Sequence, residues 1–111
     1  MPKASDADKD RFRLLVPSGP AVEVKPMFGQ LGAFVNGNMF AGLFGSAVGV
    51  KLDDEGSAAL AAVPGSGPFG PDERPMGGYL ALPPDLSAAD AADWLVRARD
   101  HVATLPPKPG R

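Results

Sequence analysis

The chain has 111 residues, a length typical of one small domain built around a single core. Its formal net charge of −2 argues against a surface that grips nucleic-acid phosphates, because such a surface needs a dense basic patch. The absence of cysteine excludes disulfides, thiolate nucleophiles and cysteine-bound metals.

The first predicted elements are a short helix and a strand. Ser5 followed by Asp8 resembles a weak helix start, and the turn residues 17–20 end the helix. The apolar side of this helix would consist of Phe12, Leu15 and Val16. Residues 21–25 then alternate between apolar and polar side chains, which predicts a strand.

Residues 27–52 form the centre of the predicted sheet. Asn36-Gly37 separates two apolar runs, and this pair favours a type I′ turn because both residues tolerate a positive φ. We therefore expect a hairpin, followed by a third strand over residues 47–52. The predicted cross-strand pairs are Phe34 with Met39 and Ala33 with Phe40.

Both faces of this hairpin are predicted to be apolar. Alternation places Phe34, Met39, Ala41 and Leu43 on one face and Leu31, Val35, Phe40 and Phe44 on the other. Helices must then cover one face, while a further cover, such as a second copy of the protein, shields the other. Three glycines fall inside strands, where glycine usually marks a bulge or the close approach of another group. They are Gly32, Gly42 and Gly49.

The second half contributes two helices and a strand. The acids of residues 53–55 suit a helix start, and this helix continues to about Val63. Residues 64–78 are rich in glycine and proline, which predicts either a connector pinned by Phe69 and Met76 or a binding lid. Residues 79–82 read as a strand. Ser87 with Asp90 begins the longest helix, through about Thr104, whose apolar stripe is Ala88, Ala91, Leu95, Ala98, Val102 and Leu105.

The predicted order is therefore α-β-β-β-β-α-β-α. Successive strands without intervening helices exclude a parallel doubly wound sheet. We predict an α+β fold in two layers, with an antiparallel sheet of about five strands and flanking helices. A single domain would span residues 1–111, with flexible tails at 1–4 and 106–111.

Several short motifs occur in an order that resembles one known family. They are Lys25-Pro26-Met27-Phe28-Gly29, the turn around Asn36-Gly37, Val50-Lys51 before an acidic helix start, Arg74-Pro75-Met76-x-Gly78-Tyr79 and Leu105-Pro106-Pro107-Lys108. Over residues 22–109 the chain resembles the N-terminal domain of the TfoX/Sxy family. The resemblance implies a small α+β domain associated with regulators of natural competence and with no established chemistry. Gln30 replaces a second glycine of the family motif, and the sequence holds no C-terminal helical domain of those regulators, so we expect a stand-alone domain.

The residues that bear chemistry do not form a catalytic or metal-binding set. His101, the one histidine, suits a partly exposed position near a helix end, and Gly65-Ser66-Gly67 does not match a nucleophile elbow. The acids of residues 53–55 lack the alternate spacing of a calcium loop, and Gly29-x-x-Gly32 leads into a strand in place of the helix that a phosphate loop requires. We expect no metal and no cofactor, and we predict that the protein is not an enzyme.

One cluster of candidate binding residues remains. Lys25, Lys51 and Arg74 lie beside the family-like motifs at predicted strand ends, and their convergence near Phe28 and Met76 would make a small cationic, apolar-lined pocket for an acidic group. The candidate binding residues are Lys25, Met27, Phe28, Gly29, Lys51, Arg74 and Met76. The alternative is ordinary solvated lysines and an exposed arginine.

Two classes of function follow from these patterns. The first is a non-enzymatic regulatory or protein-interaction domain, whose partner is a regulatory protein or a second copy in a homodimer. The second is a small-molecule or acidic-ligand binding domain that uses the cationic pocket and residues 64–78. Direct nucleic-acid binding is disfavoured by the charge. We also expect no membrane segment and a cytoplasmic location, because apolar runs are interrupted by glycine and the first residues lack a signal-peptide core.

Overall fold

The computed structural model describes residues 5–19, 21–27, 30–69 and 78–106. Within these residues the chain forms three helices and one six-stranded antiparallel sheet. The elements are α1 (Asp6–Leu15), β1 (Val22–Met27), β2 (Gln30–Val35), β3 (Asn38–Phe44), β4 (Ala47–Lys51), α2 (Asp54–Ala61), β5 (Gly67–Pro68), β6 (Tyr79–Ala81) and α3 (Ala88–Ala103). The predicted α+β class and element order are confirmed. The added strand, β5, has two residues and lies in the stretch predicted as irregular.

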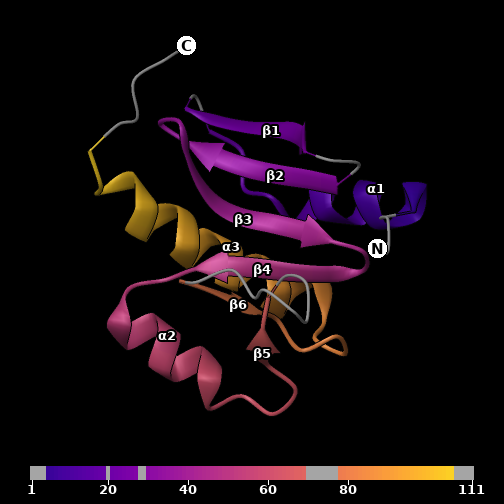
Figure 1. The fold of residues 1–111 in the computed structure, drawn as a ribbon, viewed down its shortest axis with the longest axis vertical. Coiled ribbons are helices and arrows are strands. Elements are labelled where there is room, and N and C mark those ends of the chain that lie inside the picture. Colours follow the sequence, from indigo (N-terminus) through magenta and orange to yellow (C-terminus); the bar gives the residue numbers. More distant parts are fainter. Residues whose placement is uncertain (1–4, 20, 28–29, 70–77, 107–111) are drawn as a thin grey trace.

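The sheet forms one layer and the helices α1 and α3 form the other. The strand order is β1-β2-β3-β4-β6-β5, so the first four strands are a meander and β6 returns beside β4. In Figure 1, α1 and α3 lie behind the sheet, while α2 stands at its lower edge. The helix α3 packs mainly on β3 and β4, and α1 contacts α3 and β2. The longest helix therefore covers the sheet, as its apolar stripe predicts.

Each helix begins at a side chain that accepts a hydrogen bond from the first turn. Ser5 and Asp8 form a capping box, since each side chain accepts from the other residue's backbone N–H at 3.1 Å. Asp53 accepts from the Gly56 N–H at 2.7 Å, and Ser87 accepts from the Asp90 N–H at 3.1 Å. These caps fix the helix starts at the positions that the sequence predicts.

The central hairpin turns at Asn36-Gly37, where φ is 53° and 82°. The predicted pairing of Phe34 with Met39 is confirmed. The predicted pairing of Ala33 with Phe40 is wrong, because Ala33 pairs with Ala41 and the register shifts between Ala33 and Phe34. Phe40 is the extra residue of a β-bulge.

The bulge changes which side chains share a face. Paired residues project to the same side of a sheet, so Leu31, Ala33, Ala41 and Leu43 face the helices together. Phe40 also joins that core, with 0% of its surface exposed. The two predicted face sets are therefore wrong, because strict alternation does not hold across a bulge.

The core lies between the helices and this face of the sheet. Its buried members are Phe12, Leu15, Leu31, Ala33, Val35, Phe40, Ala41, Leu43, Val48, Val50, Leu52, Leu60, Leu82, Ala91, Leu95, Ala98 and Val102. The stripe predicted on α3 is buried from Ala91 to Val102, whereas Ala88 is exposed and Leu105 is half-buried.

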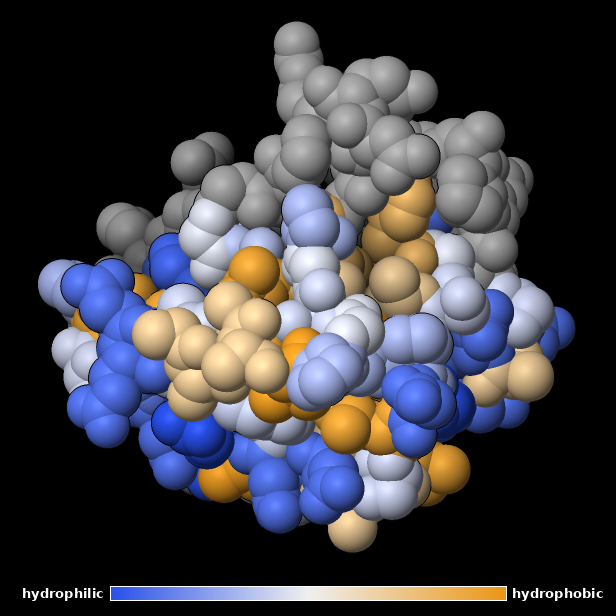
Figure 2. All heavy atoms as spheres, turned by 90° about the horizontal axis from the view of Figure 1, so that it is seen from below, coloured by the Kyte–Doolittle hydropathy of each residue, from blue (hydrophilic) through white to orange (hydrophobic). Residues whose placement is uncertain are grey.

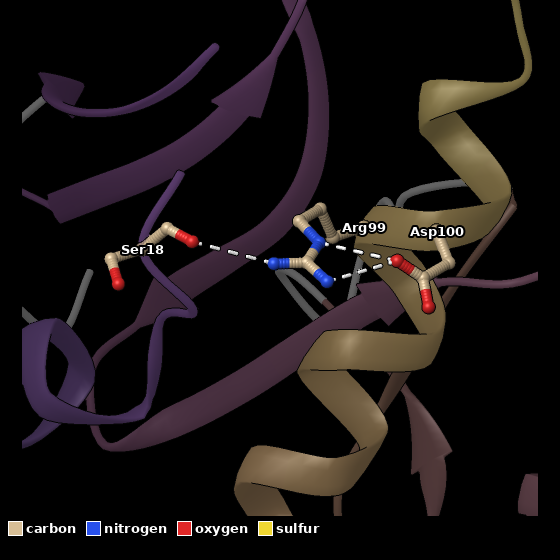
Figure 3. A network of polar contacts seen from close by, with 3 residues as sticks. All are labelled: Ser18, Arg99 and Asp100. Carbon is tan, nitrogen blue, oxygen red and sulfur yellow. Dashed lines mark hydrogen bonds and ion pairs between the residues drawn. The ribbon is translucent and has the colours of Figure 1, made fainter. Parts of the chain in front are cut away.

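A polar contact holds α3 against the segment that follows α1. The guanidinium of Arg99 donates to the backbone carbonyl of Ser18 at 3.4 Å and to the Asp100 carboxylate at 3.0 and 3.2 Å (Figure 3). Arg99 and Asp100 are adjacent on one helix and Asp100 is largely exposed, so the ion pair itself contributes little to stability. The bond to Ser18 links segments that are 81 residues apart.

Candidate functional site

A row of cross-strand partners, most of them glycine or alanine, crosses the sheet on the side opposite the helical layer. From β1 to β5 the row consists of Lys25, Gly32, Gly42, Gly49, Ala81 and Gly67. We call this side of the sheet the glycine face. Three central strands therefore meet here without side chains, which leaves room for another group to lie against the backbone.

Phe69 occupies part of this room. Its side chain is buried, with 2% exposed, yet it does not belong to the core on the helical side. A Cβ at Gly49 would overlap the Phe69 ring, and one at Gly42 would lie 3.3 Å from Phe69 Cε2. The predicted close approach is confirmed at these two glycines. The predicted pin at Phe69 is confirmed as well, whereas Met76 lies outside the described residues.

Phe69 also covers part of the glycine face, the second sheet face that was predicted to need shielding. The ring comes from the segment after α2, so the chain itself shields Gly42 and Gly49. This cover extends to Tyr79, whose ring centroid is 6.4 Å from that of Phe69. A second copy of the protein is thus unnecessary for the middle of the glycine face.

Tyr79 connects β6 to β3 across β4. Its hydroxyl donates a hydrogen bond of 2.9 Å to the carbonyl of Met39, next to the bulge at Phe40. Partial burial raises the pKa of Tyr79 above its ordinary value, because the anionic form is poorly solvated there. Tyr79 belongs to the motif that ends in Gly78-Tyr79, but sequence reasoning did not select it as a site residue.

The two described lysines among the candidate residues both lie on the glycine face. Lys25 Nζ is 5.4 Å from the Phe34 ring centroid and 3.5 Å from Glu23 Oε2. Lys51 Nζ lies 6.0 Å from the Tyr79 ring centroid. Each ammonium group therefore has an aromatic neighbour of its own.

The lysines do not meet at one point. They belong to β1 and β4, which are three strand spacings apart, about 14 Å. Met27 is the last residue of β1. Phe28, Gly29, Arg74 and Met76 lie outside the described residues, so the predicted cationic pocket stays a prediction.

Gln30 has a structural use that sequence reasoning missed. Its side chain is 7% exposed, and its Oε1 accepts a 2.9 Å hydrogen bond from the backbone N–H of Gly45. Gly45 lies in the turn between β3 and β4, with a φ of 60°. Gln30 therefore links the start of β2 to this turn. The signal in the sequence that could have indicated this role is a single glutamine in an otherwise apolar stretch.

A cleft of about 240 Å³ opens where α1, β4, β6 and α3 meet. Its apolar lining includes the buried side chains of Leu15, Val48, Leu82 and Ala91. Arg11 is the one charged residue among the described residues that line it. Sequence reasoning missed this site because its lining comes from five separate segments.

A second apolar surface lies at the edge formed by α2 and the short strands. Figure 2 looks onto this edge and shows apolar residues in its middle with hydrophilic residues around them. Four exposed alanines of α2 and its C-cap contribute to it, namely Ala58, Ala59, Ala61 and Ala62. Beside them, Val63, Leu86 and Trp94 line an open groove, where the Arg97 guanidinium lies 4.8 Å from the Trp94 ring centroid.

Three side-chain hydroxyls among the described residues are used structurally. The hydroxyls of Ser57, Ser66 and Thr104 each donate to a backbone carbonyl, at 3.3, 2.9 and 2.6 Å. His101 is half-buried in the last turn of α3. In the described part of the chain, no group of three or more histidines or carboxylates could hold a metal ion.

No helix in the described ranges combines the length and the apolar character needed to cross a membrane. An antiparallel meander with two helices on one face and a glycine row on the other defines a small two-layer α+β domain. The family model of the TfoX N-terminal domain matches residues 13–102, so the chain belongs to this family. Searches of curated proteins and of solved structures gave no match.

Proposed function

We propose that the protein is a non-enzymatic, regulatory protein-interaction domain that binds an acidic partner segment across its glycine face. The observation that carries the proposal is the pair of cation and ring contacts on that face, Lys25 with Phe34 and Lys51 with Tyr79. Aromatic side chains are enriched at protein interfaces, and here each of the two rings holds a lysine ammonium beside it that an acidic group can pair with.

The spacing of the two lysines favours an extended partner. Lys51 lies two residues along β4 from Gly49, which is in line with Lys25, so the two residues are about 15 Å apart, and this separation suits two carboxylates along one segment better than one small acid. Each ring would offer an apolar contact beside the charged one. β1 lies at the edge of the described sheet, and an edge strand offers backbone groups for further pairing.

The absence of enzymatic activity is part of the proposal. Its support is that the hydroxyls of Ser57, Ser66 and Thr104 are bound to backbone carbonyls, and that Phe69 and Tyr79 fill the middle of the glycine face with packing. We further propose that the domain acts in the cytoplasm, since a chain without cysteine needs no oxidising environment.

A pull-down from the native host with matched baits tests the proposal. The test bait carries Lys25→Glu and Lys51→Glu, and the control bait carries Arg13→Glu and Arg97→Glu, two exposed arginines on helices. We expect the test bait to lose its specific partner at least tenfold while the control bait retains it. Equal recovery of all partners by both baits would overturn the proposal.

Self-association is measured separately. Light scattering after size exclusion gives the mass of the wild type and of both variants. If the wild type is a dimer that the lysine changes dissociate, the acidic partner is a second copy of this chain. If the wild type is a monomer, the captured protein is the partner, and its binding to the purified domain should weaken with added salt.

A further inference from the structure

The cleft beside Arg11 has walls that the fold holds in place. One wall is α1, whose Arg11 and Leu15 are one turn apart and line the cleft together. The opposite wall is the loop at Gly65, where φ is +94° and a Cβ would lie 3.1 Å from Pro83 Cβ. The Leu82 N–H donates to the Val48 carbonyl at 2.8 Å and ties β6 to β4 at the floor.

Arg11 brings a positive charge to a lining whose other described residues are apolar or glycine, apart from Ser46. Of the three acids on its own helix, Asp8 caps α1, Asp10 lies 3.4 Å from Arg13, and Asp6 is five residues before Arg11 and so is not its neighbour on the helix surface. Arg11 itself has no ion-pair partner among the described residues. A guanidinium beside an apolar cavity matches a carboxylate with an apolar tail.

The size of the cleft limits the ligand. At about 30 Å³ for each water-sized group, 240 Å³ holds about eight non-hydrogen atoms. We infer that the cleft binds a small monocarboxylate of about this size, with the carboxylate on Arg11 and the apolar tail against Leu15, Val48 and Ala91. This site is separate from the lysines of the proposed partner surface, so either proposal can fail alone.

A titration with sodium hexanoate, followed by amide NMR shifts, tests the inference. Hexanoate has eight non-hydrogen atoms, and 1-hexanol is its neutral counterpart. We expect hexanoate to shift the amides of Ala47, Leu82 and Ala91 with a Kd on the order of 1 mM, as expected for a ligand this small. Hexanol should bind at least tenfold more weakly, because it makes no charge-assisted bond.

Two variants of the same helix test whether the charge of Arg11 holds the ligand. Arg11→Gln should weaken hexanoate about tenfold or more and leave hexanol unchanged. Arg13→Gln, one exposed residue of the same helix outside the lining, should bind hexanoate as the wild type does.

Other results would overturn the inference. Equal shifts with hexanoate and hexanol would show that Arg11 does not select an anion. Equal binding by Arg11→Gln and Arg13→Gln would exclude the guanidinium contact. Shifts confined to the groove at Trp94 would place the ligand elsewhere.

Discussion

Single residues on the glycine face decide whether an aromatic ring can reach the backbone. Gly49 lies under Phe69, and no side chain fits between them. Gly67 belongs to the same row but has open space where its Cβ would be. Two glycines in one row therefore have different reasons to be glycine, and substitution distinguishes them.

Gly49→Ala should destabilise the domain by about 1–3 kcal/mol, because the added methyl group forces the Phe69 ring away from the sheet. Gly67→Ala should be neutral or stabilise by up to about 1 kcal/mol, since alanine restricts the unfolded chain at no steric cost. Urea unfolding monitored by circular dichroism measures both changes.

A double variant checks the cause. Phe69→Ala alone should be destabilising, by about 3–5 kcal/mol for a buried ring. If the ring is the obstacle, Gly49→Ala should cost little more when Phe69 is already alanine. Fully additive losses would mean that Gly49 matters for some reason other than Phe69.

At the scale of elements, the short strand β6 is held by a side-chain hydrogen bond in addition to the backbone hydrogen bonds of the sheet. The Tyr79 hydroxyl reaches past β4 to the Met39 carbonyl on β3, beside the bulge. Burial raises the pKa of Tyr79, so the folded chain holds this proton to a higher pH than the unfolded chain. The resulting stability is fully present below about pH 10, the ordinary tyrosine pKa, and is lost as pH rises through the folded pKa.

Tyr79→Phe should lower the free energy of unfolding by about 1 kcal/mol at pH 8, because the Met39 carbonyl loses its donor. The gap between the wild type and this variant should shrink as pH rises above about 10. Urea unfolding at pH 8 and pH 11 measures the gap, and absorbance at alkaline pH follows the one tyrosine of the chain directly. A gap that stays constant with pH would contradict a role for the Tyr79 proton in this hydrogen bond.

At the scale of the whole molecule, the core extends past the family match. The match begins at residue 13, yet Phe12 has 0% of its surface exposed and packs in the same core as α3. The part of α1 that carries Phe12 therefore belongs to the folding unit. Leu14, two residues on, is 85% exposed and provides a control of similar chemistry on the same helix.

Phe12→Ala should destabilise the domain by about 3–5 kcal/mol, because it leaves a cavity beneath α1. Leu14→Ala should change stability by less than about 0.5 kcal/mol. Thermal and urea unfolding of the two variants measure the difference. If Phe12→Ala lost as little stability as Leu14→Ala, α1 would lie outside the cooperative core.

The sequence by itself determined the order of the elements and most of their ends. Local chemistry decides these features: Ser5, Asp53 and Ser87 cap their helices, and Asn36-Gly37 accepts the positive φ of the turn. The apolar stripe of α3 likewise required only the helical period.

Only the tertiary structure decided what lies on each face of the sheet. A bulge at Phe40 shifts the register by one residue, and no local pattern in the hairpin predicts it. The contact of Phe69 with Gly49 and the assembly of the Arg11 cleft join segments distant in sequence. Such contacts depend on how the elements pack, which a pattern along one segment does not encode.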